Sequence, residues 1–156
     1  MKLLIVFYSR SGTTRTLAGR LQKLLNCDLQ EVKPLTNYRG LFGLFRAGYH
    51  TGKGIASPYA PVTHDPGQYD RVIIGFPVWG GNLPAPMRTF VEDHQAHIKR
   101  LAVFATGGNP DTKRVMDNLG LYYRDPVDAN LFLRRKHVKR GQSEDALRGF
   151  VEKVLS

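Results

Sequence analysis

Cysteine, long apolar runs and acidic side chains are all scarce in this chain of 156 residues. The one cysteine, Cys27, excludes a disulfide within the chain and is typical of the reducing cytoplasm. No apolar run approaches the roughly 18 residues of a membrane-spanning helix. The apolar segment near the start ends at Tyr8, and Ser9 and Arg10 follow it rather than a small-residue cleavage site. We therefore expect a cytoplasmic protein that has no membrane span and no signal peptide.

Acidic residues number 13 against 23 lysines and arginines, so the formal net charge is +10. The imbalance is uneven, because residues 32–64 contain no acid and residues 134–140 form a second basic block. One interpretation is a solvated surface that keeps the protein soluble, and the other is attraction to an anionic partner. The blocks contain no RNA- or DNA-binding motif, which argues against nucleic acid. Metal binding is also not expected, because no His, Cys, Asp and Glu cluster has ligand spacing.

The length and the hydrophobic content of 42% fit one globular domain that spans residues 1–156. Apolar segments of strand length alternate with helical patterns along the chain. This alternation predicts an α/β fold with a doubly wound, five-stranded parallel sheet and helices on both faces. The connection over residues 35–68 is long, with a nearly helical apolar stripe at residues 38–49. Strands are expected at residues 3–8, 28–32, 69–77, 99–105 and 129–133, the last reaching 137 at most, and helices at 14–25, 86–97, 111–119 and from the N-cap Ser143 onward.

The turn after the first strand carries four hydroxyls and one glycine within six residues. A helix begins directly after it, so backbone N–H groups and the positive end of the helix dipole point at the turn. This combination predicts an anion site whose natural guest is a phosphate monoester. An ordinary Ser/Thr helix cap is the alternative interpretation. The candidate residues are Ser9, Arg10, Ser11, Gly12, Thr13 and Thr14.

Three kinds of phosphate site are excluded by what this turn lacks. It has no Gly-Lys-Ser/Thr as in a P-loop, no three-glycine dinucleotide fingerprint, and no cysteine nucleophile. The segment Ser-Arg-Ser-Gly-Thr-Thr instead resembles the FMN-phosphate loop of the flavodoxin family, [Ser/Thr]-x-[Ser/Thr]-Gly-x-Thr after the first strand. Two other classes are also disfavoured. The third strand ends in Phe76 and Pro77 rather than a receiver aspartate, and no Gly-x-Ser-x-Gly nucleophile elbow occurs.

The turn after the third strand contains the only tryptophan, followed by two glycines. It closely resembles the flavin-ring loop of short flavodoxin-family proteins, and an indole offers a flat apolar face for an isoalloxazine. In the family, a glycine peptide here bonds flavin N5 and changes orientation with redox state. A surface tryptophan in a Pro/Gly turn is the alternative. The candidate residues are Pro77, Val78, Trp79, Gly80, Gly81 and Asn82.

The turn after the fourth strand consists of Thr106, Gly107, Gly108 and Asn109. The resemblance implies that its backbone N–H groups reach the pyrimidine edge of the flavin. Many family members place an aromatic side chain here to cover the ring, and this chain has none. Tyr49, Tyr59 or Tyr122 could take that place, or one side of the ring stays open.

Taken together, the three turns identify the chain as a member of the flavodoxin family. The resemblance implies strand order 2-1-3-4-5, noncovalent FMN, and electron transfer or flavin-dependent oxidoreduction with a redox protein or a small electron acceptor. The basic blocks predict that this partner is anionic and that they rim the flavin pocket. No side chain stands out as a general acid or base, so no catalytic residue is named. The alternatives are an NAD(P)H:quinone-type reductase and a non-enzymatic module that binds anionic partners.

Overall fold

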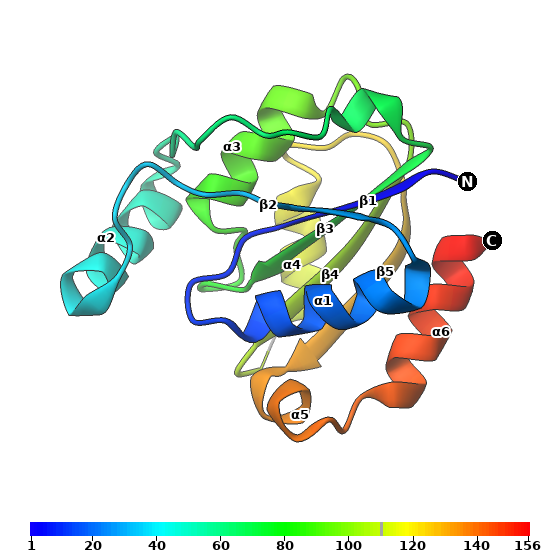
Figure 1. The fold of residues 1–156 in the computed structure, drawn as a ribbon. Helices are drawn as coiled ribbons and strands as arrows, with labels where there is room; N and C mark the ends of the chain where they lie inside the picture. The colour runs from blue at the N-terminus through cyan, green and yellow to red at the C-terminus, as the bar shows by residue number, and fades with distance from the viewer. Residues whose placement is uncertain (110) are drawn as a thin grey trace.

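The computed structural model describes residues 1–109 and 111–156 of the chain, and strands alternate with helices along it (Figure 1). A short 3₁₀ helix at Pro66–Gln68 precedes the third strand. The elements are β1 (Leu3–Phe7), α1 (Thr13–Leu25), β2 (Asp28–Glu31), α2 (Gly40–Lys53), β3 (Arg71–Pro77), α3 (Ala85–His94), β4 (Leu101–Gly107), α4 (Thr112–Leu119), β5 (Val127–Arg134), α5 (Arg135–Arg140) and α6 (Glu144–Leu155).

The five strands form one parallel sheet in the order β2-β1-β3-β4-β5, which confirms the predicted fold class and strand order. The order reverses beside β1, because β2 pairs with one edge of β1 and β3 with the other. In open parallel sheets, ligands bind beyond the carboxyl ends of the strands at such a reversal. The turn after β1 therefore lies where a ligand is expected.

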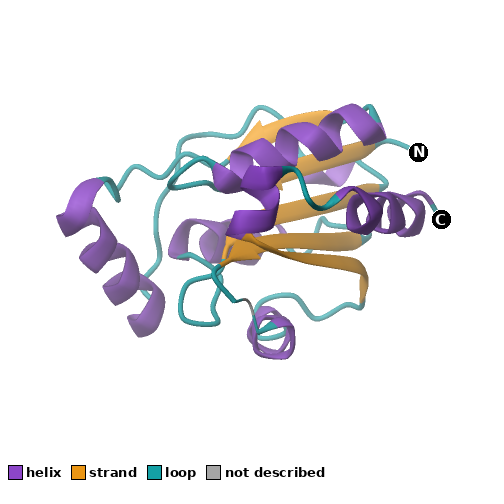
Figure 2. Ribbon diagram, turned by 90° about the horizontal axis from the view of Figure 1, so that it is seen from below, coloured by secondary structure: helices purple, strands orange, loops and turns teal. Residues whose placement is uncertain are grey.

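Both faces of the sheet are covered by helices, as Figure 2 shows. Along β1, Leu4 and Val6 join the core beneath α3 and α4, whereas Ile5 and Phe7 join the core beneath α1 and α6. Successive side chains of a strand point to opposite faces, so a continuous apolar run is what two covered faces require. This is why β1 carries no polar residue.

Several predicted boundaries were wrong by two or three residues. β3 and β4 each begin two residues later than expected, and β4 continues to Gly107. α3 ends at His94 rather than at residue 97. β5 ends at Arg134, close to the predicted end, and the extension toward residue 137 that sequence analysis left open does not occur, because the chain turns into the short helix α5. Val138 is buried against the core beneath α1 and α6, and Gly141 ends α5 at a φ of +67°.

The nearly helical stripe predicted within the long connection is a regular helix, α2, which projects away from the sheet (Figures 1 and 2). Its C-terminal end is held by the buried Arg88 of α3. The Arg88 guanidinium donates to the carbonyl oxygens of Thr51, at 3.3 Å, and Ile55, at 2.5 Å. Within the described residues, none of the helices has the length and apolar character that crossing a bilayer requires.

Candidate functional site

The three turns predicted to carry the site follow the carboxyl ends of β1, β3 and β4, on the same side of the sheet. Hydrogen bonds join them to one another. The Val78 N–H donates to the Thr106 carbonyl oxygen at 2.8 Å, which joins the turn after β3 to the end of β4. The hydroxyls of Thr14 and Thr106 lie 2.9 Å apart and are both buried, which joins the start of α1 to the end of β4. The structure therefore brings the three turns together.

α1 begins directly after the turn that follows β1, so its N-terminus faces this turn. Gly12 is its N-cap at a φ of +98°, a conformation that favours glycine, and no side chain caps the first turn. The first turn also contains no acidic residue. The first N–H groups of a helix have no carbonyl partner within it, so those of Thr13, Thr14 and Arg15 remain to bind an anion.

The hydroxyls of this turn do not serve as the ordinary helix cap that was the alternative interpretation. The Ser9 hydroxyl accepts from the Gly12 N–H at 3.0 Å and keeps its own proton to donate. Thr13 and Thr14 are buried, whereas Ser11 is exposed. Arg10 is half-buried beside them.

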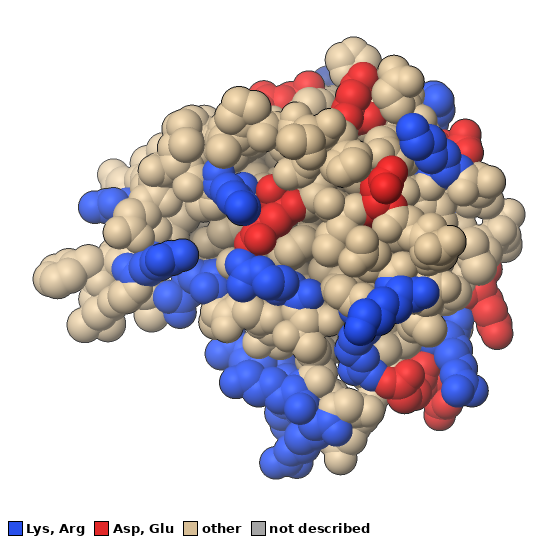
Figure 3. All heavy atoms as spheres, viewed as in Figure 1, with Lys and Arg blue, Asp and Glu red and all other residues tan. Residues whose placement is uncertain are grey.

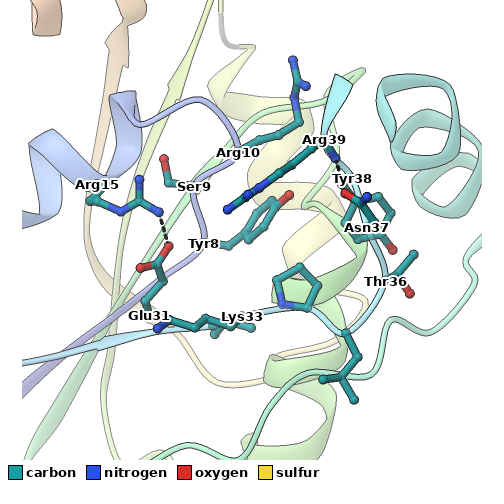
Figure 4. A pocket seen from close by; sticks show the side chains of 13 residues that line it. Tyr8, Ser9, Arg10, Arg15, Glu31, Lys33, Thr36, Asn37, Tyr38 and Arg39 are labelled. Carbon is teal, nitrogen blue, oxygen red and sulfur yellow. Dashed lines mark hydrogen bonds and ion pairs between the residues drawn. The ribbon is translucent and has the colours of Figure 1, made fainter. Parts of the chain in front are cut away.

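A cavity of about 730 Å³ lies beside this turn and is lined by residues 8–10, Arg15 and residues 31–39 (Figure 4). Four of its lining residues are cationic and one, Glu31, is acidic. Arg15 and Glu31 form an ion pair at one side of the cavity. That pair neutralises the carboxylate, so the cationic residues that remain to act on a ligand are Arg10, Lys33 and Arg39.

The turn after β3 is a tight hairpin around two glycines. Trp79 and Asn82 exchange backbone hydrogen bonds of 3.2 and 3.0 Å, with Gly80 at a φ of +58° and Gly81 at +78° between them. Two central residues with positive φ are typical of a type I′ turn, which explains the Gly-Gly sequence. Asn118 of α4 donates to the Gly81 carbonyl oxygen at 2.9 Å and thereby holds the hairpin in place.

A second cavity of about 290 Å³ separates this hairpin from the turn after β4. Its walls include Val78, Gly80 and Gly81 on one side and residues 107–109 on the other. Sequence analysis assigned Thr106 and Gly107 to the turn, but they are the last residues of β4. Sequence analysis also missed two lining residues from the start of α4, Asp111 and Arg114. Their residue types did not indicate a binding site. An aspartate before a helix is an ordinary N-cap, and Asp111 is the N-cap of α4.

Trp79 lines neither cavity, but its ring contacts two tyrosines that line the first. Its ring is half-buried and meets Tyr8 edge-on at 5.7 Å between centroids, and it meets Tyr38 at 6.4 Å. Both tyrosines line the first cavity, and the sequence neighbours of Trp79 line the second. Burial, and secondarily the nearby Tyr38, raises the pKa of the Tyr8 hydroxyl, so Tyr8 is neutral at physiological pH.

Sequence analysis offered three tyrosines as a cover for the flavin ring, with one open side as the alternative, and which of these holds stays a prediction. Tyr49 is exposed on α2, Tyr59 donates to Asp93 at 2.7 Å, and Tyr122 lies beside Arg88, so none lines either cavity. Tyr38 lines the first cavity instead, held by hydrogen bonds of 2.9 Å to the Ser57 hydroxyl and 2.8 Å to His50 Nδ1. Sequence analysis counted Tyr38 as the start of the helical stripe at residues 38–49, but the helix begins at Gly40 and Tyr38 lies before it.

The two basic blocks contribute unequally to the pocket. From the acid-free segment, Lys33 and Arg39 line the first cavity. From the second block, Arg134 donates to the Asn109 side-chain oxygen at 3.1 Å, at the rim of the second cavity. Residues 135–140 form α5 and line neither cavity. Three cations of the two blocks, Lys33, Arg39 and Arg134, therefore lie at or beside the cavities, and that the blocks rim a flavin pocket stays a prediction.

The buried pair of threonine hydroxyls yields a stability prediction. Thr14→Val should lower the free energy of unfolding by about 1–3 kcal/mol, because it leaves the Thr106 hydroxyl buried without a partner. Thr106→Val should cost a similar amount. The double variant should cost clearly less than the sum of the two. Urea unfolding of all four proteins measures this coupling, and strictly additive losses would show that the two hydroxyls do not depend on each other.

Comparison with known proteins identifies the family and the fold. A family model described as Flavodoxin matches residues 56–154, which contain the second and third turns but not the turn after β1. A flavoprotein from Lactobacillus acidophilus NCFM, solved in complex with FMN, superposes with a TM-score of 0.71 at 22% identity, over 89% of this chain and 97% of that one.

Oxidised flavodoxin 1 from Bacillus cereus superposes with a TM-score of 0.56 at 19% identity, over 99% of this chain and 97% of that one. Likenesses at these identities establish the fold. The family model, which matches more than half of the chain, establishes the lineage: the protein belongs to the flavodoxin family.

Proposed function

We propose that the chain binds FMN noncovalently and uses it for electron transfer or flavin-dependent oxidoreduction. The observation that carries this proposal is the N-terminus of α1. It has neither a side-chain cap nor an acidic residue, and it lies beyond the carboxyl end of β1, where strand order reverses. Membership of the flavodoxin family and the FMN in the L. acidophilus flavoprotein support the choice of FMN over other phosphate monoesters.

The turn after β1 has the donors that a phosphate dianion requires. The N–H groups at the start of α1, the hydroxyls of the turn and Arg10 are the proposed donors. Hydrogen bonds from such donors to a charged oxygen are stronger than those between neutral groups. The proposed phosphate-binding residues are Ser9, Arg10, Ser11, Gly12, Thr13 and Thr14.

The two Gly-containing turns are proposed to hold the ring system. Gly80 has no heavy atom within 4 Å of where a Cβ would stand, so the backbone there is open to a ligand. The second cavity runs between this glycine and residues 107–109, whose N–H groups are proposed donors. The proposed ring-binding residues are Pro77, Val78, Trp79, Gly80, Gly81 and Asn82 with Thr106, Gly107, Gly108 and Asn109.

Bound FMN would supply one- and two-electron redox chemistry, and the protein would position it and control access to it. The cations Arg10, Lys33 and Arg39 around the first cavity favour an anionic redox protein or an anionic small acceptor as partner. The single cysteine supports a cytoplasmic location.

The first test compares FMN with riboflavin, which lacks the phosphate. FMN should bind the apoprotein much more tightly, because only FMN can use the N-terminus of α1. Ser11→Ala should weaken FMN binding by about 1–3 kcal/mol, since a donor to a charged oxygen is lost. Ser11 is exposed, so the fold should not change. Flavin fluorescence titration measures both affinities.

Riboflavin is also the control for this variant, because Ser11→Ala should leave its affinity unchanged. Equal affinity of the parent protein for FMN and riboflavin would contradict the phosphate assignment. Much tighter binding of FAD than of FMN would reassign the cofactor.

The second test concerns Trp79, which is proposed to stack on the flavin ring. An indole in contact with the ring should quench the flavin emission of the complex, and Trp79→Ala should restore part of it. Trp79→Phe is the matched control, since it keeps an aromatic ring beside Tyr8 and Tyr38. Emission that stays equally quenched in Trp79→Ala would place Trp79 outside contact with the flavin.

A further inference from the structure

Helix α2 exposes five large apolar side chains that no part of the described chain covers. Phe42 is 87% exposed and Phe45 71% exposed, which is unusual for phenylalanine in a folded domain. Leu41, Leu44 and Tyr49 are the other three. The buried face of the helix consists of small residues and Thr51. α2 therefore packs on the protein through its small side and presents its large apolar side outward.

Positive charge borders this apolar face, and negative charge is absent from the surrounding sequence. Arg46 and Lys53 each follow an exposed aromatic residue, Phe42 and Tyr49, by four positions, so they lie next to these rings on the helix surface. Residues 32–64 contain no acid. Figure 3 shows only blue and tan atoms on the projection that Figure 1 identifies as α2.

We propose that α2 docks this protein on an anionic lipid surface. A helix with exposed phenylalanine and leucine beside lysine and arginine is the pattern of helices that lie in the membrane interface. The apolar side chains would enter the region between headgroups and acyl chains, and the cations would meet anionic headgroups. Arginine and lysine suit this edge position, because their apolar stems extend along the buried zone while the charge stays in water.

Charge argues against a second copy of the chain as the occupant of this face. Two α2 helices packed through their apolar faces would bring Arg46 and Lys53 of one copy close to the same residues of the other. The acid-free segment offers no carboxylate to offset that repulsion. An anionic bilayer satisfies both the apolar and the charged requirement at once.

The attachment of α2 to the body would bring the first cavity close to the lipid surface. Tyr38 and Arg39 directly precede α2 and line that cavity. Gly43 lies against the backbone of Tyr38, where an added Cβ would fall 2.2 Å from the Tyr38 carbonyl carbon. Arg88 of α3, which donates to the carbonyl oxygens of Thr51 and Ile55, fixes the C-terminal end of α2 to the body rather than leaving it on a loose tether.

The test is co-sedimentation of the full chain with vesicles. The protein should bind vesicles of phosphatidylcholine mixed with phosphatidylglycerol, and it should bind vesicles of phosphatidylcholine alone much more weakly. Phe42→Ser with Phe45→Ser should lower the partition coefficient on anionic vesicles by at least about tenfold, because two apolar anchors are lost. Arg46→Gln with Lys53→Gln should also weaken binding and reduce its sensitivity to salt.

Two matched controls carry the same changes elsewhere on the surface. Leu24→Ser with Leu121→Ser removes two exposed apolar side chains outside α2, and Lys136→Gln with Lys139→Gln removes two charges from α5. Both controls should bind anionic vesicles within about twofold of the parent protein, because only α2 enters the interface. Thermal unfolding of each variant verifies that the fold is intact.

Failure of the parent protein to bind anionic vesicles would overturn the proposal, as would equal losses in the phenylalanine variant and the leucine control. If the parent protein is a dimer, the phenylalanine variant is a monomer and neither binds vesicles, the apolar face of α2 serves self-association instead. The assay uses no flavin, so its outcome is independent of the proposed FMN function.

Discussion

The free N–H groups at the start of α1 are the constraint on which the candidate site depends. They point toward the carboxyl end of β1, where strand order reverses. No capping side chain and no acidic side chain in the first turn accepts hydrogen bonds from them. The rest of the edge is built around that point. The Thr14–Thr106 hydroxyl pair and the backbone bond from Val78 to Thr106 fix the other two turns beside it. The three turns of the candidate site are therefore held together at the carboxyl ends of the strands.

Features encoded by local sequence were predictable. The apolar run of β1, followed by hydroxyls and a glycine, indicates a strand, a tight turn and a helix, and the structure has all three, whereas anion binding at the turn stays a prediction. The Gly80–Gly81 pair likewise indicates a tight turn, and the structure has one at positive φ. The family resemblance supplied the strand order, which local patterns do not encode.

Features that depend on long-range packing were not predictable. Tyr38 meets Trp79, 41 positions further along the chain, and no periodic pattern links the two. Arg114 reaches the second cavity only because α4 packs beside the Gly80–Gly81 hairpin. The helix α5 takes the place of the strand extension that sequence analysis left open, because Val138 packs into the core beneath α1 and α6. In each case a contact between distant segments decided the outcome.

The measurement that tests the central claim most directly follows the backbone amides of the apoprotein by ¹H–¹⁵N correlation NMR. The amide protons of Thr13, Thr14 and Arg15 should shift strongly downfield when FMN is added, because they would donate to its phosphate. Riboflavin should leave these three amides nearly unmoved while it shifts the amides of Gly80 and Gly108. Identical shifts of Thr13, Thr14 and Arg15 with the two ligands would contradict the account, because the N-terminus of α1 would then not bind the phosphate.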